Sequence, residues 1–183
     1  MDLILLQPGN ADDIIGANSS TLIDDTWRSD ELKFGKCLEL VSIHHGMKQQ
    51  ITTDVSNRAR TSGRPIITEF TCVKYVDQTS VKLYDYCLRA ATLGSGADKP
   101  TKIYIARNSG ENTSNIITMA LRDAIISEIQ FQSHPDDMPT EQFKINFTEI
   151  LWTYTVQNVD MTAGGSFHAG WSVMHNRPIG NFT

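Results

Sequence analysis

Apolar and polar side chains alternate with a period of two along most of the chain, which predicts β-strands. The longest such run, residues 142–157, would span about 50 Å as one straight strand, so we expect it to be bent, bulged or shared between two neighbours. A second long run is rich in β-branched residues, which favours two strands that meet near Arg122 and Asp123. The segments predicted to form strands are residues 2–7, 37–51, 66–76, 101–107, 116–133 (as two strands), 142–157 and 171–176.

One segment changes its apolar period from two to nearly four, which predicts a single amphipathic helix over about residues 80–92. Asp77 or Thr79 would cap its start, and Gly94 stands where the C′ residue is expected. The side chains expected to face the core are Val81, Tyr84, Leu88 and Ala91.

Three segments lack a clear period and predict long loops: about residues 10–35, 52–65 and 157–168. The first has room for a short helical turn. Many strands, one helix and no βαβ alternation indicate a single mainly-β domain over residues 1–183. We expect an antiparallel barrel or sandwich whose helix covers an open side or edge of a sheet.

The composition is that of an ordinary globular protein. It says little about the fold, but its charge balance limits the classes of partner that the chain would bind. At 183 residues the chain suits one domain, and 16 Lys and Arg against 21 Asp and Glu give a net charge of −5. An acidic balance argues against duplex nucleic acid or an anionic membrane as the main partner. No run approaches the length of a membrane span, and the start MDLILLQPGN lacks the basic region and cleavage site of a signal peptide.

The residues that most often carry chemistry form no catalytic pattern in the sequence. The cysteines, Cys37, Cys72 and Cys87, have no CxxC spacing, so we expect reduced thiols, and Cys87 is interpreted as a small buried hydrophobe. His44 and His45 are adjacent on a predicted strand and would point to opposite faces, and no metal-binding spacing is found. We therefore expect no enzyme activity, no cofactor and no metal.

Three arginines lie close together in the segment 52–65: Arg58, Arg60 and Arg64. Guanidinium groups bind phosphate and carboxylate well, so this run could contact an acidic partner. A solvated loop is the equally weighted alternative, because the segment offers few apolar residues with which to pack.

Four passages of the chain, taken in order, carry a family resemblance. TEFTCVKYVDQTSVKLYDYCLRA leads into the helix, KIYIARNSGENTSNIITMALRDAIISEIQ contains a turn of the form R-x-x-G-E, and EQFKINFTEILWTYTVQ precedes AGWSV. The residues concerned are Lys74, Asp77, Ser80, Leu83, Arg107, Gly110, Glu111, Trp152, Tyr154, Gly170 and Trp171. Together these passages resemble the Hcp family, the tube protein of bacterial type VI secretion systems.

The resemblance implies a two-sheet β-barrel with one flanking helix, assembled as a six-membered ring, with rings stacked into a tube that is expelled to deliver effectors. It implies other copies of the chain, a spike protein, a contractile sheath and secreted effectors as partners, and neither nucleic acid nor membrane insertion. The protein would be made in the bacterial cytoplasm and then be secreted without a signal peptide. Arg58, Arg60 and Arg64 are expected in loops where rings stack. The alternative is a ring-shaped chaperone or carrier that binds effectors in its lumen.

Overall fold

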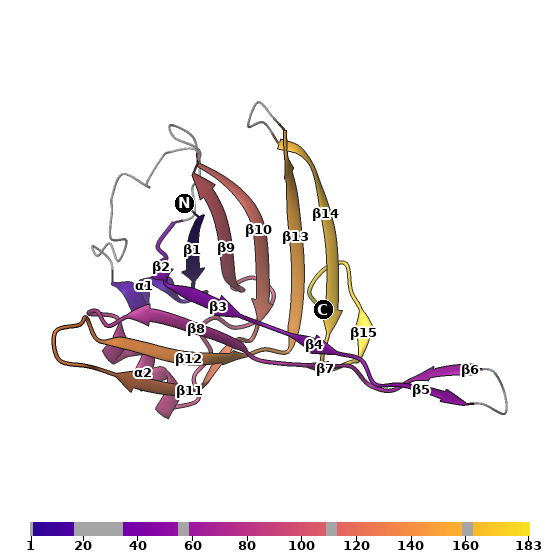
Figure 1. Ribbon diagram of the computed structural model, residues 1–183, viewed down its shortest axis with the longest axis horizontal. Helices are drawn as coiled ribbons and strands as arrows, with labels where there is room; N and C mark the ends of the chain where they lie inside the picture. The colour runs from indigo at the N-terminus through magenta and orange to yellow at the C-terminus, as the bar shows by residue number, and fades with distance from the viewer. Residues whose placement is uncertain (1, 17–34, 55–58, 109–112, 159–162) are drawn as a thin grey trace.

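The computed structural model describes residues 2–16, 35–54, 59–108, 113–158 and 163–183, and most of these residues lie in antiparallel strands (Figure 1). One sheet has seven strands in the order β15-β14-β13-β10-β9-β1-β2, and we call it the large sheet. Its strands are β1 (Asp2–Gln7), β2 (Leu38–Leu40), β9 (Thr101–Asn108), β10 (Thr113–Arg122), β13 (Glu149–Gln157), β14 (Ala163–Ser172) and β15 (Arg177–Pro178).

The second sheet, called the small sheet, has four strands in the order β11-β12-β8-β3. These are β3 (Ser42–His44), β8 (Phe70–Tyr75), β11 (Ile125–Gln132) and β12 (Thr140–Asn146). In Figure 1 its strands run across the lower part of the large sheet, whose long strands β10, β13 and β14 rise beyond it. The predicted mainly-β, two-sheet fold is confirmed, although within the described residues the two sheets stay separate in their hydrogen bonding and do not close into one barrel.

The chain passes directly from one sheet to the other between β2 and β3 and at two corners between longer strands. β10 turns into β11 at Asp123, which has a left-handed φ of 49°, and β12 turns into β13 at residues 147–148. The over-long apolar pattern over residues 142–157 is therefore bent and divided between the two sheets, as expected. The prediction of two strands meeting near Arg122 and Asp123 is also confirmed.

The core lies between the sheets because each contributes one apolar face to it. In the large sheet, Leu6 pairs with Ile103 and Ile103 with Met119, so their side chains line one face. The fully buried side chains that meet these residues include Phe70, Leu83, Leu121, Ile126, Phe143, Ile145 and Ile150. A smaller group of buried residues comprises Leu3, Leu5, Cys37, Tyr104 and Ala106.

The helix α2 (Ser80–Leu88) is shorter than predicted and shows a different face to the core. Leu83 and Tyr86 are buried, whereas Val81 and Leu88 are 74% and 87% exposed, so the predicted buried stripe is wrong. The helix packs beside β11, and the face that carries Leu83 and Tyr86 meets the core in place of the predicted face with Val81 and Leu88. The helix ends at Leu88, with Arg89 as its C-cap, and Ala90 follows with a φ of 50°. Gly94 is therefore not its C′ residue. Cys87, which was interpreted as buried, is only half-buried.

Two predicted loops contain strands. The segment 52–65 was expected to be irregular, but β5 (Ile51–Asp54) pairs with β6 (Ala59–Ser62) in a two-stranded ribbon. Together with the pair β4 (Met47–Lys48) and β7 (Ile66–Ile67) it projects from the body, and we call β4 to β7 the arm (Figure 1). Thr52 lies opposite Thr61 in the register of this ribbon, so its strands pair through their backbones without an apolar period in the sequence.

The glycine-rich segment 157–168 was also expected to be a loop, but its second half forms much of β14. At Gly170, further along the strand, a Cβ would collide with Leu151 of β13 and with Ile179, so glycine serves close packing there instead of a turn. The predicted last strand, 171–176, is wrong beyond Ser172, where a turn leads to β15. The predicted strand 37–51 is broken into short pieces, and α1 (Ala11–Ile15) provides the helical turn expected after residue 10.

Candidate functional site: buried polar clusters and assembly surfaces

A buried polar group fixes the start of α2 to the small sheet, and we call Lys74, Asp77, Ser80 and Glu141 the helix-anchor cluster. Lys74 Nζ lies 2.9 Å from Glu141 Oε1, and the Ser80 hydroxyl donates to the same oxygen at 2.9 Å. Asp77 Oδ1 lies 3.1 Å from Lys74 Nζ. The side chains of Lys74 and Glu141 are almost fully buried, so neither charge is solvated by water.

The helix-anchor cluster gives three of the family-motif residues a structural role. Asp77 Oδ1 accepts the backbone N–H of Thr79 at 2.8 Å, which orders the turn before α2. Leu83, on the next turn of the helix, is fully buried in the core. Sequence reasoning missed Glu141 because it lies on β12, far along the chain, and no local pattern marks it as the partner of Lys74.

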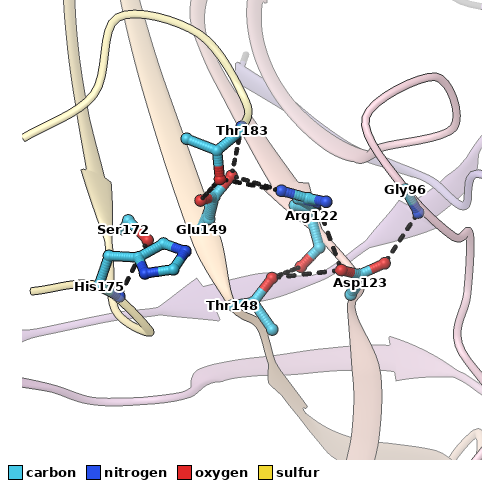
Figure 2. Close-up of polar contacts among 8 residues, drawn as sticks. All are labelled: Gly96, Arg122, Asp123, Thr148, Glu149, Ser172, His175 and Thr183. Carbon is cyan, nitrogen blue, oxygen red and sulfur yellow. Dashed lines mark hydrogen bonds and ion pairs between the residues drawn. The ribbon is translucent and has the colours of Figure 1, made fainter.

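A second cluster joins the sheet corners to the end of the sequence (Figure 2). The side chain of Glu149, at the start of β13, is fully buried, and its Oε2 accepts the Thr183 N–H at 3.0 Å while Oε1 accepts the Thr183 hydroxyl. Arg122 Nη1 lies 3.2 Å from Glu149 Oε2. We call Arg122, Asp123, Glu149, Ser172 and Thr183 the C-terminal cluster.

The C-terminal cluster also holds the β10–β11 corner. Asp123 Oδ1 accepts the Gly96 N–H at 2.8 Å, and the Thr148 hydroxyl donates to the Arg122 carbonyl at 3.2 Å (Figure 2). The two corners are thereby bonded to each other and to the segment that follows α2. These polar bonds add to the apolar packing of Ala124 and Phe147 at the same corners.

Glu149 remains ionised in spite of its burial. Burial raises the pKa of this carboxyl, but hydrogen bonds from Thr183 and Ser172 and the positive charge of Arg122 outweigh that effect. The net result is a pKa below the ordinary value of 4.5. A carboxylate held in this way is suited to structural anchoring and not to proton transfer near neutral pH.

The remaining motif residues lie on the large sheet. Trp152 and Trp171 are partly buried against the core, whereas Tyr154 is 48% exposed and pairs across β13 and β14 with Phe167, which is 70% exposed. Arg107 lies near the end of β9 and is exposed. Gly110 and Glu111 lie outside the described residues.

The structure describes only one of the three clustered arginines in full. Arg64 is exposed, and its guanidinium donates to the Val173 carbonyl. The backbone of Arg60 lies in β6, but its side chain, like the whole of Arg58, lies outside the described residues. The proposed stacking role of these residues therefore stays a prediction.

Exposed apolar side chains gather on three surfaces of the described chain. They are Val81 and Leu88 on α2, the Tyr154–Phe167 pair on β13 and β14, and Met47, Ile51 and Ile66 on the arm. Contiguous exposed apolar patches are candidates for surfaces that other molecules cover. The arm fits this description because a two-stranded ribbon is marginal in water without packing partners.

The described residues include few groups suited to covalent or metal chemistry. Burial raises the pKa of both the Cys37 and the Cys72 thiol to about 12, which keeps them protonated. Within the described ranges no three His, Cys, Asp or Glu side chains converge as a metal site. No helix in that part of the chain has the length and apolarity needed to cross a membrane.

Comparison with known proteins identifies the family to which the chain belongs. A family model described as "Type VI secretion system effector, Hcp" matches residues 29–154, more than half of the chain. The chain belongs to the Hcp family. The resemblance seen in the sequence is thus confirmed, and no curated protein matches the chain.

Solved structures share the fold of this Hcp-family chain at low sequence identity. A structure described as that of a type six secretion system protein is 18% identical, covers 98% of this chain and 100% of its own, and has a TM-score of 0.78. The crystal structure of Hcp1 from Salmonella typhimurium is 18% identical with coverage of 97% and 99% and a TM-score of 0.70. The secreted protein Hcp3 from Pseudomonas aeruginosa is 16% identical, covers 91% of this chain and 95% of its own, and has a TM-score of 0.53.

Proposed function

We propose that this chain is the subunit of a type VI secretion tube, which forms six-membered rings that stack and are expelled to deliver effectors. The observation that carries the proposal is the match to the Hcp family over residues 29–154. The protein is made in the bacterial cytoplasm and then secreted. Its partners are other copies of itself, a spike protein at the tip, a contractile sheath and the effectors that travel with the tube.

The exposed surfaces support this proposal because a closed ring is a heterologous assembly, in which each subunit uses two different complementary faces. The outer side of α2, with Val81 and Leu88, and the Tyr154–Phe167 pair lie on different elements and provide two such faces. The arm reaches away from the body and suits contacts beyond the ring, between stacked rings. Arg64 lies on the arm between β6 and β7, and we propose that Arg58, Arg60 and Arg64 act together in the contact between rings.

The first test is the solution mass of the purified chain by light scattering after size exclusion. A mass near six times 20.4 kDa supports the ring, and a monomer at high concentration refutes it. Negative-stain images of the same sample show whether the rings stack. If rings form but the bacterium secretes normally after deletion of the gene, the tube role fails while the ring stands.

The stacking role of the arginines has its own experiment. Charge reversal of Arg58, Arg60 and Arg64 to Glu should leave the ring mass unchanged and abolish tube growth and secretion. Replacement of all three by Lys keeps the charge and is the matched control. Normal tubes from the Glu variant would remove the arginines from the stacking contact.

A further inference from the structure

His45 lies between β3 of the small sheet and β4 of the arm, where the chain enters the arm. The imidazole of His45 stacks on Phe70, with ring centroids 4.0 Å apart and planes 6° from parallel, and Phe147 lies 6.0 Å away. Phe70 is fully buried in the core. His45 therefore connects the base of the arm to the core, whereas sequence analysis treated it only as one of two adjacent histidines, His44 and His45, without metal-binding spacing.

Directly beside His45, the first hydrogen bonds of the arm are made between Gly46 and Thr68. Gly46 N–H donates to the Thr68 hydroxyl at 2.9 Å, and Thr68 N–H donates to the Gly46 carbonyl at 2.9 Å. The next pair along is Met47 and Ile67, in β4 and β7. We call His45, Gly46 and Thr68 the arm root, because the paired strands of the arm start there.

The arm root suits a neutral imidazole and not a charged one. His45 makes a hydrogen bond to the backbone of Thr68, but its Nε2 is buried and has no hydrogen-bond partner among the described residues. Protonation would place a second N–H, with a positive charge, in this unpartnered position. Burial lowers the pKa of His45 below its ordinary value of 6.5, the hydrogen bond to Thr68 opposes this, and the neighbouring His44 lowers it further.

The nearby charged groups have partners elsewhere. Glu69, which follows Thr68, accepts a hydrogen bond from Asn146 Nδ2 at 2.9 Å, and Lys144 on β12 is paired with Glu128. Arg64 on the arm donates to the Val173 carbonyl. His44, the last residue of β3, is exposed and directly precedes His45. The two acidic side chains among these groups are both paired on β12, Glu128 with Lys144 and Glu69 with Asn146.

We propose that His45 is a pH-dependent anchor of the arm: its neutral ring holds the arm root against Phe70 and Thr68, and protonation releases the arm from the body. Because the folded state binds the proton less well than the unfolded arm root, the anchor is intact above the ordinary imidazole pKa and weakens as pH falls below it. The arm would then be ordered near neutral pH and loosened in a mildly acidic compartment. This inference concerns the arm of a single chain and holds whether or not the chain forms tubes.

Amide hydrogen exchange at pH 7.5 and pH 5.5 tests the anchor, with each rate divided by the intrinsic rate at that pH. For a group with a free pKa near 6.5 and a lowered pKa in the folded state, protection of the arm-root amides is expected to fall by up to about tenfold between the two values. The readout covers Thr68 and the arm strands β4 and β7, and peptides from β9 and β10 provide the internal reference, whose protection should not change.

Three variants make the test specific. His45→Phe keeps the ring stack and cannot be protonated, so its protection should be equal at both pH values. His45→Gln serves the same purpose if the Phe variant does not fold. His44→Gln changes the exposed neighbour and should keep the wild-type fall. Equal wild-type protection at both pH values, or the same fall without the imidazole of His45, would overturn the proposal.

Discussion

Thr183 binds Glu149 with both its backbone N–H and its hydroxyl, so the final residue of the sequence is bonded to a fully buried carboxylate. The same carboxylate faces Arg122 at the corner where the chain leaves the large sheet. One acidic side chain thus connects the C-terminal segment to the corner that sets the angle between the sheets. Removing Arg122 or Thr183 would leave this buried carboxylate with fewer partners.

Loss of the Glu149 charge should destabilise the fold at neutral pH. Glu149→Gln is expected to lower the free energy of unfolding by about 1–3 kcal/mol, the range for a buried group that loses its partners. Thr183→Ala should cost about 1 kcal/mol and Thr183→Ser almost nothing, because serine keeps the hydroxyl. Urea unfolding at pH 7 measures all three.

The pH dependence of the same cluster has a definite sign. Because the folded pKa of Glu149 is below its ordinary value of 4.5, its contribution to stability is present above that value and is lost as pH falls through the folded pKa. The stability difference between wild type and Glu149→Gln should therefore shrink between pH 5 and pH 3. A difference that stays constant over this window would show that ionisation of Glu149 does not stabilise the fold.

The buried Lys74–Glu141 pair predicts strong coupling between two residues far apart in the sequence. Lys74→Met alone should destabilise the fold by about 3–5 kcal/mol, because it leaves the buried Glu141 carboxylate without an ion-pair partner. Glu141→Leu alone should cost less, because Asp77 still faces the Lys74 ammonium. The double variant should recover most of that loss, since it leaves neither charge behind. A double-mutant cycle in guanidinium chloride measures the coupling, and additive single effects would refute it.

Local patterns in the sequence predicted most of the strands and the corner near Arg122 and Asp123, but not the corner at residues 147–148. The period of residues 142–157 shows only that two faces alternate, and the bend at residues 147–148 depends on the core that forms around it. The buried stripe of α2 was misplaced because Val81 and Leu88 fit a helical period as well as Leu83 and Tyr86 do. Only tertiary packing decides which stripe is covered.

The clusters that organise the structure were only half visible in the sequence. Lys74, Asp77 and Ser80 stand close together and carried the family resemblance, but Glu141 and Glu149 looked like ordinary strand residues. Long-range ion pairs have no local signature, so a single sequence does not reveal them. Glycine was misleading in the opposite direction, because Gly164 and Gly165 indicated a loop but lie within β14.

Gly170, one of the family-motif residues, should not tolerate a larger side chain. A Cβ at this position would collide with Leu151 and the Ile179 carbonyl, whereas a Cβ at Gly180 would meet no atom within 4 Å. Gly170→Ala is expected to cost about 1–3 kcal/mol through overpacking, and Gly180→Ala should be close to neutral. Thermal unfolding of both variants side by side measures the contrast.

The exposed side of α2 should contribute to assembly and not to folding. Val81→Gln with Leu88→Gln removes two apolar side chains that are 74% and 87% exposed, so the unfolding midpoint should change little. If α2 faces a ring neighbour, the same change should shift the solution mass from the ring towards the monomer. An unchanged ring mass would place the ring contact on another surface.

Cysteine reactivity should separate the three thiols by their surroundings. Burial raises the pKa of Cys37 and Cys72 to about 12, so at pH 8 almost no thiolate exists at either position, and both sulfurs are shielded by the core. Cys87 is only half-buried on α2, and we expect it to be the one thiol that a disulfide reagent titrates quickly in the native chain. Cys87→Ser should abolish this fast phase, and urea should restore a signal from the other two. A fast phase that survives in Cys87→Ser would mean that the strands over Cys37 or Cys72 open readily, which would contradict the tightly packed core.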